Sequence, residues 1–211
     1  MQKNLRLFVL AAATLTGVAA QAQDSTLKVG VIRYDAHSKT NGVTGVGIPP
    51  GADAEVGDAS TLLLTYEYAF TPKVGVELVL GVPPKIKAKA TGSVAFLGDV
   101  LTARNVSPTL LVNWHAGDPG DAFRPYLGLG LNYTTFKNVT TPYGWDVKLG
   151  DSMGFAVQAG ADYAFSKNWG LFASFGRAQV KSKLVATGAV VLQSTIDFRP
   201  RTYAIGASYR F

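Results

Sequence analysis

The last nine residues of the chain alternate strictly between two kinds of side chain. Read with the period of two that a β-strand imposes, Tyr203, Ile205, Ala207, Tyr209 and Phe211 share one face, and small or polar residues share the other. A soluble protein rarely ends in an exposed apolar strand, because such an edge invites pairing with another chain. A strand of an outer-membrane barrel requires this pattern, with aromatic residues at the interface. The segment therefore predicts a lipid-facing strand.

The same alternation recurs along the chain, and the connections between the alternating segments are short and long in turn. An even number of such strands with alternating connections is typical of bacterial outer-membrane barrels. We therefore predict an all-β fold, an eight-stranded antiparallel transmembrane β-barrel with short periplasmic turns and long extracellular loops. The predicted strands are 27–36, 61–70, 74–82, 107–116, 124–136, 153–165, 169–181 and 203–211, with a looser stretch at 184–199. Aromatic residues near the short turns predict an interfacial girdle: Tyr68, Phe70, Trp114, Tyr126, Tyr163, Phe165, Trp169 and Phe211.

Residues 1–22 have the composition of a signal peptide. Lys3 and Arg6 precede an apolar stretch without charges, and Ala20-Gln21-Ala22 is a small-residue cleavage site. An uncleaved anchor is the alternative, although the apolar stretch is short for a membrane span. Cleavage leaves residues 23–211 as one barrel domain without cysteine. Without the two leader charges, the excess of basic over acidic residues falls from six to four, which is too mild to indicate nucleic-acid binding.

Alternation alone does not reveal which face of the strands points inward. A soluble ligand-binding barrel of the lipocalin type would turn its apolar face inside. Here the less apolar face consists of glycine, alanine, serine, threonine and isolated charges, which suits the narrow interior of a small membrane barrel. Because an unpaired charge away from water is costly, we expect Glu67, Glu77 and Arg210 to pair inside the lumen.

One long segment and several short ones carry a resemblance to a known family. The segment 123–136 reads FRPYLGLGLNYTTF, and it is supported by 75–78, 108–110, 160–163 and the terminal 209–211. In these segments the chain resembles the outer-membrane protein W (OmpW) family, which includes alkane-uptake relatives. The resemblance implies a Gram-negative outer-membrane location, a narrow and partly hydrophobic lumen, and porin-like passage of small hydrophobic compounds. Some members also serve as receptors for bacteriocins or phages.

Four inward apolar residues, Ile32, Val79, Leu111 and Phe172, fall at similar heights on their strands. Our hypothesis is that they form a lumen layer that binds a hydrophobic solute. Plain filling of a small barrel is the alternative explanation.

Pro83 and Pro84 interrupt a strand near its outer end, because proline cannot donate to a ladder. A gap there would give a solute a lateral exit into the membrane above the charged lumen floor; an ordinary strand end is the alternative. Basic residues in the following loop are expected to contact lipopolysaccharide phosphates, unless they only form a solvated loop. They are Lys85, Lys87, Lys89 and Arg104.

No enzyme constellation emerges from the sequence. His37 and His115 are expected at opposite ends of the barrel, too far apart for a shared metal or catalytic site. Ser38 would point away from its neighbour His37. We therefore predict no catalysis, metal or cofactor, and we expect Phe211 to be read by the barrel insertion machinery. The predicted function is passive uptake of small hydrophobic molecules across the outer membrane; the alternative is a structural or receptor barrel without a conduit.

Overall fold

The computed structural model describes residues 25–211 except 37, 41, 46 and 189–190. The predicted signal peptide and His37 lie outside these residues. Within the described part of the chain, no helix has the length and apolar character needed to cross a membrane.

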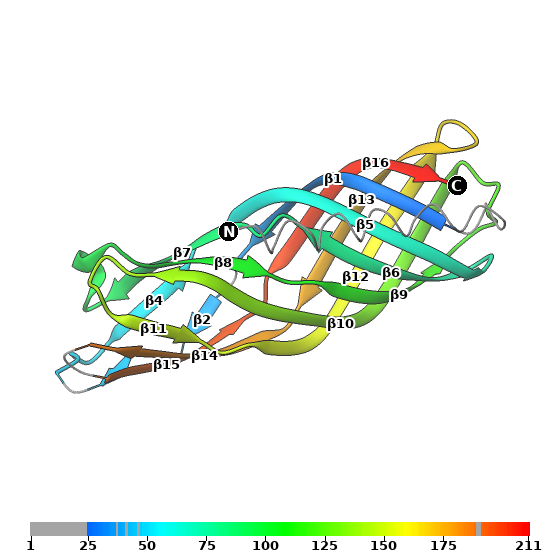
Figure 1. The fold of residues 1–211 in the computed structure, drawn as a ribbon. Helices are drawn as coiled ribbons and strands as arrows, with labels where there is room; N and C mark the ends of the chain where they lie inside the picture. The colour runs from blue at the N-terminus through cyan, green and yellow to red at the C-terminus, as the bar shows by residue number, and fades with distance from the viewer. Residues whose placement is uncertain (1–24, 37, 41, 46, 189–190) are drawn as a thin grey trace, which may run out of the picture.

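The central feature is a closed ring of eight antiparallel strands (Figure 1). In order around the ring they are β1 (Ser25–Asp35), β5 (Ala59–Thr71), β6 (Val74–Gly81), β9 (Thr109–His115), β10 (Phe123–Thr140), β12 (Ser152–Ala164), β13 (Trp169–Ala178) and β16 (Arg201–Arg210). The ring closes because β16 pairs with β1, with Gly206 opposite Gly30, and β10 pairs with β12. The prediction of an eight-stranded antiparallel barrel is confirmed.

The apolar face of the strands is the outer face. Leu62, Leu127 and Ile205 are each about 60% exposed, whereas Lys28 and Asn113 are fully buried inside the ring. This is the reverse of a soluble ligand-binding barrel, whose outer surface is polar. An exposed apolar band around a polar interior is the arrangement that lipid requires.

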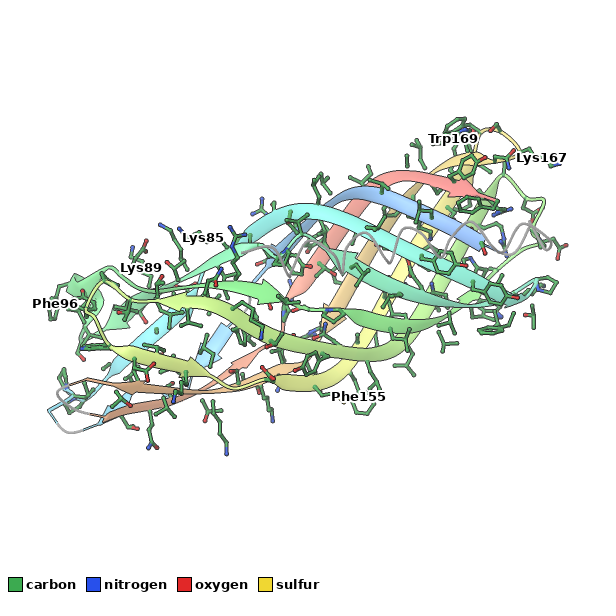
Figure 2. All side chains as sticks on the ribbon, viewed as in Figure 1. Lys85, Lys89, Phe96, Phe155, Lys167 and Trp169 are labelled. Atoms are coloured by element: carbon green, nitrogen blue, oxygen red, sulfur yellow. The ribbon has the colours of Figure 1, made fainter. Side chains whose placement is uncertain are left out.

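Aromatic side chains gather at the end that carries the short turns. Trp169 stacks edge-on against Tyr209, whose ring also meets that of Phe211. Figure 2 shows Trp169 and Lys167 at this end of the molecule. The predicted girdle was wrong in one member, because Tyr126 is only 3% exposed and lies inside the barrel. Its strand alternates, so the neighbour of outward-facing Leu127 has to point inward.

Beyond the ring, the strands continue at the opposite end as two further sheets (Figure 1). One sheet joins the outer end of β10 to β8 (Asp99–Val106), β7 (Lys85–Gly92) and β4 (Ala52–Val56). The other is formed by β11 (Asp146–Leu149), β14 (Val180–Thr187), β15 (Val191–Phe198), β2 (Ser38–Thr40) and β3 (Thr44–Gly45). A short 3-10 turn, η2 (Ala95–Leu97), joins β7 to β8. Parts of the predicted long loops are therefore strands.

The bend between β6 and β7 sets the direction of the outer sheet's side chains. Leu78, Leu80 and Val82 point outward. If this alternation continued without interruption, Pro84 would point outward and Lys85 would point inward. The structure shows Pro84 buried and Lys85 exposed, which is a slip of one residue at the two prolines. As a result, the lysines of β7 face outward and its apolar residues face inward.

Candidate functional site

An apolar chamber lies between the two outer sheets. Its cavity volume is about 130 Å³. The β7–β8 side contributes Ile86, Ala88 and Leu101, and the opposing sheet contributes Val147 and Leu184. These residues come from segments that are distant in sequence, so the chamber exists only when both sheets are assembled.

A second cavity of about 80 Å³ lies within the ring, at mid-barrel. The structure brings all four residues of the predicted lumen layer to its wall: Ile32, Val79, Leu111 and Phe172. Ile32 and Phe172 also pack into one buried cluster with Leu63, against which Val79 lies. Polar groups such as Glu77 and Gln158 share the wall, so this cavity is less apolar than the chamber.

Phe198 separates the two cavities and lines both of them. It is the last residue of β15 and is 5% exposed. Sequence analysis missed it, because its stretch was predicted only as loosely strand-like. Ser174, Gly176 and Ala178 on β13 are small, and the large side chain at this level comes instead from the outer sheet.

Below mid-barrel, a cluster of charged side chains crosses the lumen. The ammonium of Lys28 lies 3.0 Å from an Asp162 oxygen and 3.5 Å from a Glu67 oxygen. It also lies over the ring of Tyr126, 4.5 Å from the ring centre, which adds a cation–π contact. His115 Nε2 lies 2.6 Å from the other Glu67 oxygen. Five strands thus contribute to one cluster, and its mutual pairing offsets the cost of removing the charges from water.

A hydrogen-bonded layer lies against this cluster. Asn113 Nδ2 donates to Glu77 Oε2 at 2.9 Å, and Gln158 Nε2 donates to Asn113 Oδ1 at 2.8 Å. The layer is seated on Gly128, where an added Cβ would come within 2.3 Å of Asn113 Oδ1 and 2.8 Å of Gln158 Cγ. We call the cluster and this layer together the floor: Lys28, Glu67, Glu77, Asn113, His115, Tyr126, Gln158 and Asp162.

The predicted partner of the two glutamates was wrong. Arg210 Nη1 donates to the carbonyl of Pro119 at 2.7 Å, and the cation beside Glu67 is Lys28. Arg210 is the last residue of β16, so it reaches a periplasmic turn, while Lys28 lies further inside the ring on β1. The sequence could have identified Lys28 as the cation in the lumen, because alternation on β1 places it on the same inward face as Ile32.

The ladder continues past the two prolines on both sides. Val82 donates its amide to Leu62, and the carbonyl of Pro84 accepts from the amide of Asn105. Beyond them β7 pairs with both β4 and β8. Backbone hydrogen bonds therefore close the wall on both sides of Pro83 and Pro84, which counts against the lateral exit predicted there.

The four basic residues of the predicted loop all lie on the outer sheet. Lys85, Lys87 and Lys89 alternate on β7, and Arg104 on β8 is opposite Lys85. Figure 2 shows Lys85 and Lys89 on the outside of the molecule. They line neither cavity. The K-I-K-A-K-A alternation is itself a strand signal that the prediction of a loop overlooked.

Comparison with known proteins gives a consistent picture. The model of the OmpW family matches residues 21–211. Outer membrane protein W of Vibrio cholerae is 30% identical over 214 residues, covering 97% of each chain. Outer membrane protein AlkL of Ectopseudomonas oleovorans is 27% identical, covering 79% of this chain and 73% of AlkL.

Among solved structures, the crystal structure of the outer membrane protein OprG from Pseudomonas aeruginosa superposes with a TM-score of 0.84 at 29% identity. The superposition covers 90% of this chain and 96% of OprG. The closed ring, its apolar outer band and these matches lead to one conclusion. The chain belongs to the OmpW family and is an outer-membrane β-barrel protein.

Proposed function

We propose that the barrel takes up small uncharged hydrophobic molecules passively, and that the outer chamber is where they first bind. The observation that carries this proposal is the chamber itself, an apolar cavity between the two outer sheets. Water gains little from filling such a cavity, because it needs polar partners there. The family resemblance to alkane-uptake relatives points in the same direction.

The size of the chamber defines the class of solute. A dry apolar cavity of about 150 Å³ holds a benzene-sized ligand, and this chamber measures about 130 Å³. The adjoining mid-barrel cavity adds about 80 Å³ beyond Phe198. One- and two-ring hydrocarbons therefore fit these two cavities better than long or charged molecules.

Because of the floor, we propose that solutes leave through the barrel wall and not toward the periplasm. A solute that continued toward the periplasm would have to separate Lys28 from its carboxylates, and an unpaired buried charge costs several kcal/mol. A seam exists higher up: the outer end of β10 pairs with β8, and β11 pairs with β14. Within the described residues no ladder pair joins β10 to β11. We propose this seam as the exit into the membrane.

An uptake assay with one substitution and a matched control tests the proposal. Leu184 lines the chamber, and its neighbour Val185 on the same strand is exposed on the outer face. We expect Leu184→Asp to abolish the uptake of naphthalene by whole cells, while Val185→Asp leaves it near the wild-type rate. Folding of both variants is checked by their heat-dependent migration on gels. Equal uptake by both folded variants would favour a structural or receptor barrel without a conduit.

The predicted lumen layer is tested separately. Aspartate at both Val79 and Leu111 places charge in the mid-barrel cavity. If solutes use that cavity, uptake falls as it does for Leu184→Asp. Unchanged uptake by the folded double variant would limit binding to the outer chamber.

A further inference from the structure

Three cations stand side by side on the outside of the barrel. Lys85 on β7 is directly opposite Arg104 on β8, and Arg104 is directly opposite Lys137 on β10. All three residues are exposed. Because opposite residues in an antiparallel pair have Cβ atoms about 5 Å apart on one face, the three side chains form a continuous row. We call Lys85, Arg104 and Lys137 the basic row.

This arrangement is unfavourable unless an anion lies on it. Like charges directly opposite each other destabilise a sheet. Among the described residues, no carboxylate lies within 4 Å of any of the three cations. The next basic residue on β7 differs, because Lys87 forms an ion pair of 2.7 Å with Asp99. Asp151 interacts with Lys137 only at longer range, so the charge of the basic row is only partly compensated.

The height of the row indicates what lies beside it. Val82, which is 53% exposed, directly follows β6 and is the last outward apolar residue before the proline bend. Lys85 follows three residues later, about 10 Å further along a strand. On β10, exposed Tyr133 precedes Lys137 by four residues. The row thus lies just beyond the apolar band, at the depth of lipid headgroups.

We propose that the basic row binds the phosphate groups of lipopolysaccharide in the outer leaflet. A guanidinium flanked by two ammonium groups matches a phosphate, whose oxygens accept charge-assisted hydrogen bonds from all three. The side chain of Arg104 is already oriented, because its Nη1 donates to the carbonyl of Pro83 at 3.3 Å. This changes the expectation from sequence: Lys137 joins the site, and Lys87 and Lys89 are no longer part of it.

Binding of lipid A to the purified, folded, full barrel in lipid nanodiscs tests the proposal. The probe is bisphosphorylated lipid A, compared with the same acylated disaccharide without phosphates. The test variant carries Lys85→Glu, Arg104→Glu and Lys137→Glu. The control carries Lys87→Glu, Lys148→Glu and Lys183→Glu, which makes the same change in net charge at exposed positions outside the row.

We expect the test variant to lose about tenfold or more in affinity for bisphosphorylated lipid A, and the control to lose much less. The affinity of the wild-type protein should also fall with added salt. Equal losses in test and control, or equal wild-type affinity for the phosphate-free probe, would overturn the proposal.

If the triple variant does not fold, two milder substitutions decide. Arg104→Gln should weaken binding of bisphosphorylated lipid A several-fold, and Arg104→Lys should retain most of it, because the charge remains. Wild-type affinity in folded Arg104→Gln would contradict the proposal.

Discussion

The outer chamber and the floor occupy the same barrel but are built in opposite ways. The chamber is walled by aliphatic side chains such as Leu101 and Leu184, and it leaves a cavity between two sheets. The floor consists of buried charges and amides, in which Lys28 and Asn113 are completely inaccessible. The floor crosses the narrow closed ring, whereas the chamber lies between two outer sheets that share no ladder pair among the described residues.

The difference teaches where a solute can go. An apolar molecule that enters the chamber disrupts few hydrogen bonds. One that enters the floor has to break ion pairs and hydrogen bonds, and it offers the separated groups no new partners. The floor therefore acts as a barrier and the chamber as a receiving site. The substitutions below weaken one region and ask whether the other responds.

The largest expected effect is on stability, at the centre of the floor. Lys28→Met leaves the buried Glu67 and the half-buried Asp162 without the ammonium that lies beside both. Breaking a buried ion pair in this way costs about 3–5 kcal/mol. We expect the free energy of unfolding in urea, measured in lipid vesicles, to fall by that amount. The triple variant Lys28→Met, Glu67→Gln, Asp162→Asn should recover much of it, and a single variant as stable as the wild type would contradict our description of the floor.

A smaller loss is expected where the floor is seated on the wall. Gly128→Val places a side chain where Asn113 and Gln158 now lie, and overpacking of this kind costs about 1–3 kcal/mol. Gly120 in a periplasmic turn provides the control, because an added Cβ there meets nothing within 4 Å. Urea unfolding of Gly128→Val and Gly120→Ala compares the two; equal stability would show that the floor is loosely packed.

The boundary between the two cavities should control solute size. Phe198→Leu keeps an apolar side chain but thins the boundary between the chamber and the mid-barrel cavity, both of which Phe198 lines. We expect a several-fold rise in the uptake of three-ring relative to one-ring hydrocarbons in whole cells. The exposed Phe96 on the η2 turn is a matched control, and Phe96→Leu should leave the ratio unchanged. An unchanged ratio in Phe198→Leu would remove this residue from the route.

The smallest expected effect concerns the floor's part in uptake. Gln158→Ala removes one donor to Glu77 and loosens the floor without adding a charge. If solutes leave through the wall above, the uptake of naphthalene stays at the wild-type rate. A clear increase would mean that solutes pass downward through the floor, and the lateral route would be wrong.

The barrel could be predicted from the sequence because alternation is local. The immediate neighbours of residues such as Leu62 and Ile205 show which side of the strand each occupies. In a membrane, strands with this pattern have to close into a ring. The same rule placed Glu67 and Glu77 in the lumen. Applied more strictly, it would have placed Lys28 and Tyr126 there as well.

Two features could not be predicted from local pattern. Pro83 and Pro84 shift the alternation by one residue, and only the assembled wall shows the direction in which β7 then faces. The chamber joins residues as distant as Leu101 and Leu184 across two sheets, so it depends on long-range packing. The pairing of β7 with its neighbours is also long-range, so the sequence could not show that the wall is closed at the prolines and that, within the described part of the chain, β10 and β11 lack ladder pairs.

The most direct test of the central claim uses Trp145, which lines the chamber. Trp114→Phe with Trp169→Phe leaves Trp145 as the single tryptophan of the chain. A companion protein retains only Trp114, which is exposed on the outer face of the barrel. Both are titrated in vesicles with 1-bromonaphthalene, a hydrophobic quencher. We predict saturable quenching of Trp145 that Leu184→Asp abolishes, and only linear quenching of Trp114 from solute in the membrane. Linear quenching of Trp145, with the slope seen for Trp114, would contradict the account.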